Sequence, residues 1–105
     1  MSVVEVTIVP IGTGSPSVSQ FVAGCHKILE QATDLNYQLT PMSTIIEGDL
    51  NRILEIIRQM HETPFAAGAQ RVSTTIRIDD RRDKDLTMAG KIKAVTDKLQ
   101  SGQNV

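Results

Sequence analysis

The sequence predicts an α+β domain built around a four-stranded antiparallel sheet, and three observations carry this prediction. Residues 3–11 and 71–79 alternate apolar and polar side chains, as strands do in a sheet with one buried face. Two short strand-like runs, residues 37–40 and 44–47, are close enough in the chain to form an antiparallel hairpin. Segments with helical spacing of apolar residues separate the other strands and follow the last one.

The first strand places Val4, Val6 and Ile8 on one face, and Pro10 lies near its end because proline cannot donate to a β-ladder. Residues 12–16 form a turn-rich loop. The helix after it is expected over residues 17–34, and Ser15 or Ser17 can serve as its N-cap. Its apolar stripe consists of Val18, Phe21, Val22, Cys25, Leu29 and Ala32.

A second helix is expected to follow the hairpin, with Asp49 as its N-cap. Its buried stripe should be Leu50, Ile53, Leu54, Ile57 and Met60. The residue before a proline avoids the helical region, so Thr63 and Pro64 predict an end or irregularity, with an exit at residues 66–68.

After the last strand, residues 80–85 form a charge run of mixed sign that reads as a solvated loop. The apolar residues of a final helix are Met88, Ile92, Val95 and Leu99. Residues 101–105 are expected to be a frayed tail.

The resulting order, βαββαβα, specifies a ferredoxin-like arrangement with an extra C-terminal helix, and residues 1–105 form one such domain. Right-handed crossovers place both long helices on one face of the sheet. We expect the first and third strands to lie side by side in the centre and to run parallel. Their carboxyl ends would then meet, and the loop 12–16 would approach Glu47 and Gly48.

The other face of the sheet should have no helix over it, unless the last helix folds across. By alternation this face carries Glu5, Thr7, Val9, Ser73, Thr75 and Arg77. Such a mixture suits either solvent or the sheet of a second copy. A homodimer or homotetramer formed through this face, or through an edge strand, would protect the sheet.

Composition narrows the classes of function. A net charge of −1 gives no electrostatic footprint for nucleic acid. The single cysteine, Cys25, excludes an internal disulfide and is compatible with a reducing compartment. The first residues show no signal-peptide pattern, and no apolar run approaches the ~20 residues that span a bilayer. The expectation is a cytoplasmic protein that binds no membrane.

Two features could bind a small ligand. Glu47 follows a strand and precedes a helix, where its carboxylate could bond an aminopyrimidine or balance an organic cation; a solvated acid near a helix N-terminus is the alternative. The loop before the first long helix could supply Thr13, Ser17 and Ser19, although a tight turn with a cap would use the same residues. The loop lacks the Gly-Lys-Ser/Thr ending of a P-loop.

Other chemistry finds little support. His26 and His61 fall on different predicted helices and Cys25 on a buried stripe, so neither a metal cofactor nor a nucleophile–base pair is expected. RNA recognition on this topology needs stacking aromatics on the central strands, and the strands at residues 3–11 and 71–79 have none. Acylphosphatase-like hydrolysis would need an arginine in the loop after the first strand. We therefore expect no catalytic residues.

Several segments in order carry a resemblance to a known family: residues 9–13, 17–19, 37–44, 46–48 and 71–81. Together they make the chain similar to the thiamine-binding protein family, also called YkoF-like, in its single-repeat form. The resemblance implies homo-oligomers that assemble through their sheets and bind thiamine or its hydroxymethylpyrimidine half.

Within that resemblance, the implied ligand contacts are Thr13, Ser17, Ser19, Thr44 and Glu47. In the expected topology Thr44 and Asp79 lie toward the opposite edge from Glu47 and would share its ligand only across a subunit interface. The leading interpretation is a binding protein without catalysis. An oligomeric structural or regulatory module without a ligand is the main alternative, and an enzyme acting on a small metabolite is a third.

Overall fold

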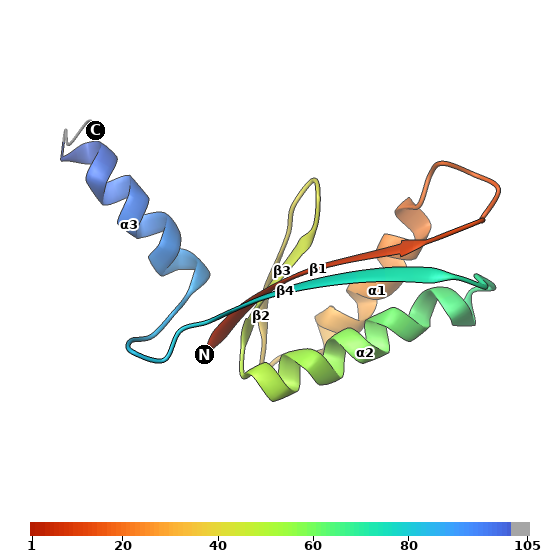
Figure 1. The fold of residues 1–105 in the computed structure, drawn as a ribbon, viewed down its shortest axis with the longest axis horizontal. Coiled ribbons are helices and arrows are strands. Elements are labelled where there is room, and N and C mark those ends of the chain that lie inside the picture. Colours follow the sequence, from red (N-terminus) through yellow and green to blue (C-terminus); the bar gives the residue numbers. More distant parts are fainter. Residues whose placement is uncertain (102–105) are drawn as a thin grey trace.

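The computed structural model describes residues 1–101 as a sheet layer, a helix layer and a projecting C-terminal helix (Figure 1). The elements in chain order are β1 (Ser2–Pro10), α1 (Ser19–Gln31), β2 (Asn36–Leu39), β3 (Thr44–Gly48), α2 (Leu50–Ala66), β4 (Val72–Asp80) and α3 (Met88–Gln100). All seven predicted elements are present. The expectation of a frayed tail falls mostly on residues 102–105, which lie outside the described residues.

The four strands form one sheet in the order β2-β3-β1-β4, and every neighbouring pair is antiparallel. This order confirms the ferredoxin-like fold. The expectation that β1 and β3 run parallel is wrong. The crossover through α1 makes β1 parallel to β2, whereas the hairpin makes β3 antiparallel to β2. The strand β3, inserted between them, must therefore oppose both.

The direction of β3 separates two features that were expected to meet. Glu47 lies opposite Val3 near the start of β1, whereas the loop 12–16 follows Pro10 at the other end. The seven residue-to-residue steps from Val3 to Pro10 span about 23 Å of strand. The predicted approach of the loop to Glu47 and Gly48 is thus wrong.

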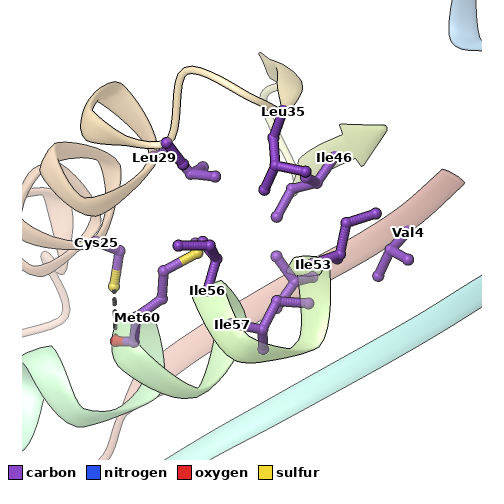
Figure 2. Packing of buried hydrophobic residues seen from close by; sticks show 11 residues of the cluster. Val4, Cys25, Leu29, Leu35, Ile46, Ile53, Ile56, Ile57 and Met60 are labelled. Carbon is purple, nitrogen blue, oxygen red and sulfur yellow. Dashed lines mark hydrogen bonds between the residues drawn. The ribbon is translucent and has the colours of Figure 1, made fainter. Parts of the chain in front are cut away.

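The hydrophobic core fills the space between the sheet and the two long helices (Figure 2). Its buried residues from the strands include Val4, Val6 and Ile46, and α1 contributes Cys25 and Leu29. From α2 the core takes Ile53, Ile56, Ile57 and Met60. The predicted stripe of α2 was misplaced at one position, because Leu54 is 37% exposed while Ile56 is buried. The helix is rotated so that residues 53, 56, 57 and 60 face the sheet.

Pro64 lies inside α2 and is buried, so the predicted end or irregularity at residues 63–64 is not an end: the helix continues to Ala66. Proline removes the N–H that would normally bond the carbonyl four residues earlier, which is that of Met60. The thiol of Cys25 donates to this carbonyl instead, at 3.4 Å (Figure 2). A contact between α1 and α2 therefore uses the acceptor that proline leaves free. The exit at residues 66–68 is confirmed by Gly68, whose φ is +103°.

The two helix starts turned out differently. Asp49 is the N-cap of α2 and accepts a hydrogen bond from the backbone N–H of Arg52 at 3.1 Å, as predicted. The helix α1 begins later than expected, with Val18 at its N-cap and no side-chain cap, so the assignment of Ser15 or Ser17 as cap is wrong.

The sheet face opposite α1 and α2 is called here the open face. Its register pairs Glu5 with Arg77, Thr7 with Thr75 and Val9 with Ser73, which confirms the predicted set of residues. The helix α3 does not fold across this face but projects from one end of the domain (Figure 1). Leu86, in the segment leading into α3, is buried, and the first turns of α3 are tied to the sheet through Glu47 and Asp79.

Candidate functional site

A pocket with a volume of about 260 Å³ opens between the β2–β3 hairpin, β1 and the start of α1. Its apolar lining includes Val18 and Val22 from α1, Met60 from α2 and Leu39 from β2. Its polar lining comes from four hydroxyl residues, Thr7, Thr40, Ser43 and Thr44. Small-molecule sites are generally apolar concavities with a few polar groups, and this pocket lies just below their usual range of about 300–1,000 Å³.

Hydrogen bonds within the hairpin hold its turn in place over the pocket. The hydroxyl of Thr40 accepts the backbone N–H groups of Met42 and Ser43, at 3.3 and 3.0 Å. Ser43 in turn donates its hydroxyl to the carboxylate of Glu5, at 3.0 Å, which ties the turn to β1. Asx- and ST-type turns use hydroxyls in this way. The pocket wall is therefore a constrained turn.

Thr44 lies on the helix-facing side of the sheet, because it pairs with Val6, which is buried in the core. Its side chain lines the pocket and is itself largely buried. Among the predicted ligand contacts, Thr44 alone lines this pocket.

Cys25 also lines the pocket from α1. Burial raises the pKa of its thiol above the ordinary value of 9.0. The thiol therefore stays protonated near neutral pH, and it donates to the carbonyl of Met60. Cys25 contributes a small apolar surface to the pocket rather than a nucleophile.

Three other predicted contacts gather at a neighbouring hollow of about 240 Å³ at the start of α1, lined by Thr13, Ser17 and Ser19. The hydroxyl of Thr13 donates to the carbonyl of Ser15 at 3.0 Å, and the hydroxyls of Ser17 and Ser19 are 3.5 Å apart. The hydroxyl of Thr13 is thus used by the loop backbone, and those of Ser17 and Ser19 lie within reach of each other, as in a turn. Val18, which lies between the two serines in the chain, lines the pocket under the hairpin, and the two linings share no residue.

Glu47 lies away from both hollows, on the open face, and is 7% exposed. Its carboxylate accepts the backbone N–H of Met88 at 2.6 Å and the side-chain amide of Asn36 at 3.1 Å. Met88 is the first residue of α3, so an acid occupies a helix N-terminus. The alternative interpretation, a solvated acid near a helix N-terminus, is right only about the helix N-terminus: Glu47 is buried, and the helix concerned is α3 rather than α2.

Asp79 lies at the same end of the sheet as Glu47, since both pair with Val3 from opposite sides. Its carboxylate is 2.6 Å from the ammonium of Lys91 on α3. The predicted grouping of Asp79 with Thr44 is therefore wrong. Glu47 and Asp79 together fix the first turns of α3 to the sheet.

Sequence reasoning missed the hydroxyls of Thr7, Thr40 and Ser43. Two of them, Thr40 and Ser43, lie in the turn of the hairpin. This turn belongs to one of the segments that carry the family resemblance, so the resemblance could have indicated them.

Within residues 1–101, no three metal-ligating side chains cluster. In the same range, no helix combines the length and apolar character needed to cross a membrane.

The fold and the pocket define a class: a small α+β domain of ferredoxin-like topology with a compact, mostly apolar pocket under its hairpin. Residues 4–96 match the family model described as thiamine-binding protein. The chain belongs to this thiamine-binding protein family.

Curated relatives extend over nearly the whole chain. The UPF0045 protein YqgV of Bacillus subtilis is 53% identical and covers 95% of this chain and 99% of its own length. A UPF0045 protein of Methanothermobacter thermautotrophicus is 37% identical, with 94% and 100% covered.

Solved structures agree on the fold. The crystal structure of hypothetical protein MJ1052 from Methanocaldococcus jannaschii superposes with a TM-score of 0.81 at 35% identity, over 90% of this chain and 95% of that one. A candidate thiamine biosynthesis/salvage protein from Thermotoga maritima gives a TM-score of 0.73 at 16% identity, over 90% and 97% of the two chains. At that identity the second likeness shows the fold alone.

Proposed function

We propose that this protein is a non-catalytic binding protein for thiamine or its hydroxymethylpyrimidine moiety, acting in the cytoplasm as a homo-oligomer. The observation that carries the proposal is the pocket under the hairpin, in a chain that belongs to the thiamine-binding protein family. The pocket is apolar enough to hold an aromatic ring and has hydroxyls that can bond ring nitrogens and an amino group.

The chemistry of the pocket favours one half of thiamine. Its lining contains no acidic side chain, and a buried cation without a partner is costly. The neutral aminopyrimidine would therefore enter the pocket, with Thr44 among its polar contacts. The thiazolium would remain near the mouth, in contact with solvent. A pocket of about 260 Å³ suits a single substituted ring better than the whole vitamin.

Calorimetric titration with thiamine and with hydroxymethylpyrimidine tests this proposal. Both should bind, because the proposed contacts are to the shared ring. The Thr44→Val variant, which keeps the shape and loses the hydroxyl, should bind about three- to tenfold more weakly, as expected for one neutral hydrogen bond. Absence of heat and of any thermal shift with millimolar ligand would exclude the proposal.

Ser17→Ala is the matched control, because it removes a hydroxyl from the neighbouring hollow. Affinity should stay unchanged in this variant if the ring sits under the hairpin. Equal weakening by Ser17→Ala and Thr44→Val would extend the site into the hollow of Thr13, Ser17 and Ser19. Loss through Ser17→Ala alone would move the site there.

Self-association through the open face is a second part of the proposal. Paired strands place Thr7, Thr75 and Arg77 on a sheet face that α1 and α2 do not cover, and a second sheet could cover it. Light scattering should therefore give a multiple of 11.5 kDa. A strictly monomeric protein would leave the alternative, an oligomeric structural or regulatory module, unsupported as well.

A further inference from the structure

The strand β1 continues beyond the end of its neighbour β3. Its pairing with β4 covers residues 2–10, whereas its pairing with β3 stops at Val6, so β1 and β4 run on together past the hairpin (Figure 1). Along residues 7–10, the side of β1 that β3 would have occupied is called here the free edge. The pocket lies at this edge, since its lining includes Ile8 from β1 and Met42 from the hairpin turn.

The register shows which backbone groups point to the free edge. In an antiparallel pair, residues that exchange both hydrogen bonds with the partner strand alternate with residues whose N–H and carbonyl point away from it. The N–H of Ile11 bonds the carbonyl of Arg71 directly opposite, at 2.8 Å, so Val9 and Thr7 bond to β4 as well. The N–H and the carbonyl of Ile8, between them, therefore both point away from β4 and toward the free edge.

The hairpin does not supply partners for these two groups. Continued by two residues, the register of β3 would bring Met42 opposite Ile8, but the strand begins only at Thr44. The N–H of Met42 bonds the hydroxyl of Thr40 instead, at 3.3 Å. Among the turns and loops of residues 1–101, no backbone group bonds Ile8. The pocket thus contains a free donor and a free acceptor side by side on one residue, and buried backbone groups require partners.

A second strand is a poor match for the free edge. Pro10 is the next residue of β1 whose backbone points to this side, and proline has no N–H to donate. Prolines protect strand edges in this way against pairing with another chain. The free edge therefore offers a single donor, at Ile8, and the pocket of about 260 Å³ beside it suits one ring.

We propose that the backbone of Ile8 recognises the ring of the ligand and selects rings that carry an acceptor next to a donor. The N–H of Ile8 donates to a ring nitrogen, and its carbonyl accepts from the neighbouring amino group. An aminopyrimidine has these two groups on adjacent positions. The inference rests on the proposed function, because it concerns the same pocket, and it assigns the selectivity of that pocket to a strand edge rather than to a side chain. Thr44 adds a further polar contact.

Two analogues of hydroxymethylpyrimidine test this assignment by calorimetry. One lacks the amino group, and the other has C–H in place of the ring nitrogen next to the amino group. Each analogue loses one of the two bonds to Ile8 and should bind about three- to tenfold more weakly than hydroxymethylpyrimidine. Equal affinity of the parent compound and either analogue would overturn the proposal.

A pair of variants assigns the lost bond to the backbone. Ile8→Pro removes the N–H and, because this N–H points away from β4, leaves the hydrogen bonds between β1 and β4 in place. Ile8→Val keeps the N–H and is the matched control. In Ile8→Val the analogue without the ring nitrogen should still bind about three- to tenfold more weakly than the parent, whereas in Ile8→Pro the two should bind alike. An undiminished difference in Ile8→Pro would overturn the proposal.

NMR of the unaltered protein gives a readout that does not depend on how the variants fold. In the free protein the amide of Ile8 should exchange with solvent faster than those of Thr7 and Val9, which bond to β4; equally slow exchange would overturn the proposal. Hydroxymethylpyrimidine should then shift the amide proton of Ile8 more than those of its two neighbours. Binding by calorimetry with an unmoved Ile8 amide would overturn this inference and leave the proposed function standing. Absence of binding would overturn both.

Discussion

Replacing Glu47 by glutamine tests whether this buried acid anchors α3. The carboxylate receives two donors, the N–H of Met88 and the amide of Asn36. A glutamine oxygen can accept one donor, but its NH₂ group would face the other. A hydrogen bond to a charged group contributes about 1.5–3 kcal/mol, against about 0.5–1.5 for a neutral one. Asn36 is exposed and can bond water instead, so we expect Glu47→Gln to lower the free energy of unfolding by about 2 kcal/mol.

For a chain of this size, a loss of ~2 kcal/mol corresponds to a fall in Tm of about 8–10 °C. Urea denaturation followed by circular dichroism measures the free energy, and amide hydrogen exchange at Met88 reports the anchor itself. Glu55→Gln is the matched control, because Glu55 is exposed and pairs with Arg52 on the same helix; it should cost less than ~1 kcal/mol. Equal effects of the two variants, with unchanged exchange at Met88, would refute the anchoring role of Glu47.

Three further predictions follow from the core and the titrating groups. Ile53→Ala should cost about 2–5 kcal/mol in urea denaturation and Leu54→Ala less than ~1, because only Ile53 is buried; similar costs would restore the stripe predicted from sequence. Burial raises the pKa of the Cys25 thiol above 9.0, so the thiol ionises at a lower pH in the unfolded chain than in the folded one. The stability that the buried neutral thiol contributes is therefore complete below that pH and declines above it. Relative to Cys25→Ser, the protein should lose stability as the pH rises past 9.0, and parallel curves would contradict this. The hydrogen bond from Arg81 lowers the pKa of Asp83 from 3.8 to about 2, so any stabilisation from it is lost as the pH falls through that range. In Arg81→Ala the pKa of Asp83, measured by following its carboxyl chemical shift with pH, should return toward 3.8.

Local pattern was sufficient for the elements. The alternation of Val4, Val6 and Ile8, and the cap at Asp49, each depend on neighbours a few residues away, and both predictions are confirmed. The stripe of α2 was less secure, because Leu54 and Ile56 both fit a broad apolar face. Contact with the sheet decides which of them turns inward.

The site depended on strand direction, which local pattern does not encode. Once β3 is antiparallel to β1, Glu47 is carried to one end of the sheet and the loop of Thr13 and Ser17 to the other. The pocket under the hairpin also needs side chains from β1, α1 and α2 together. Residues such as Thr7 and Met60, far apart in the chain, have no shared signal in the sequence that would group them.

The sequence by itself determined the order of elements, the ferredoxin-like topology and the polar character of the open face, because periodicity and turn chemistry are local properties. Only the tertiary structure decided that Glu47 holds the start of α3 and that Thr44 lines a pocket. It also showed that α3 projects from the domain (Figure 1), with Ile92, Val95 and Leu99 exposed. Each of these depends on which distant residues the strand register brings into contact, and register is fixed by packing across the whole sheet.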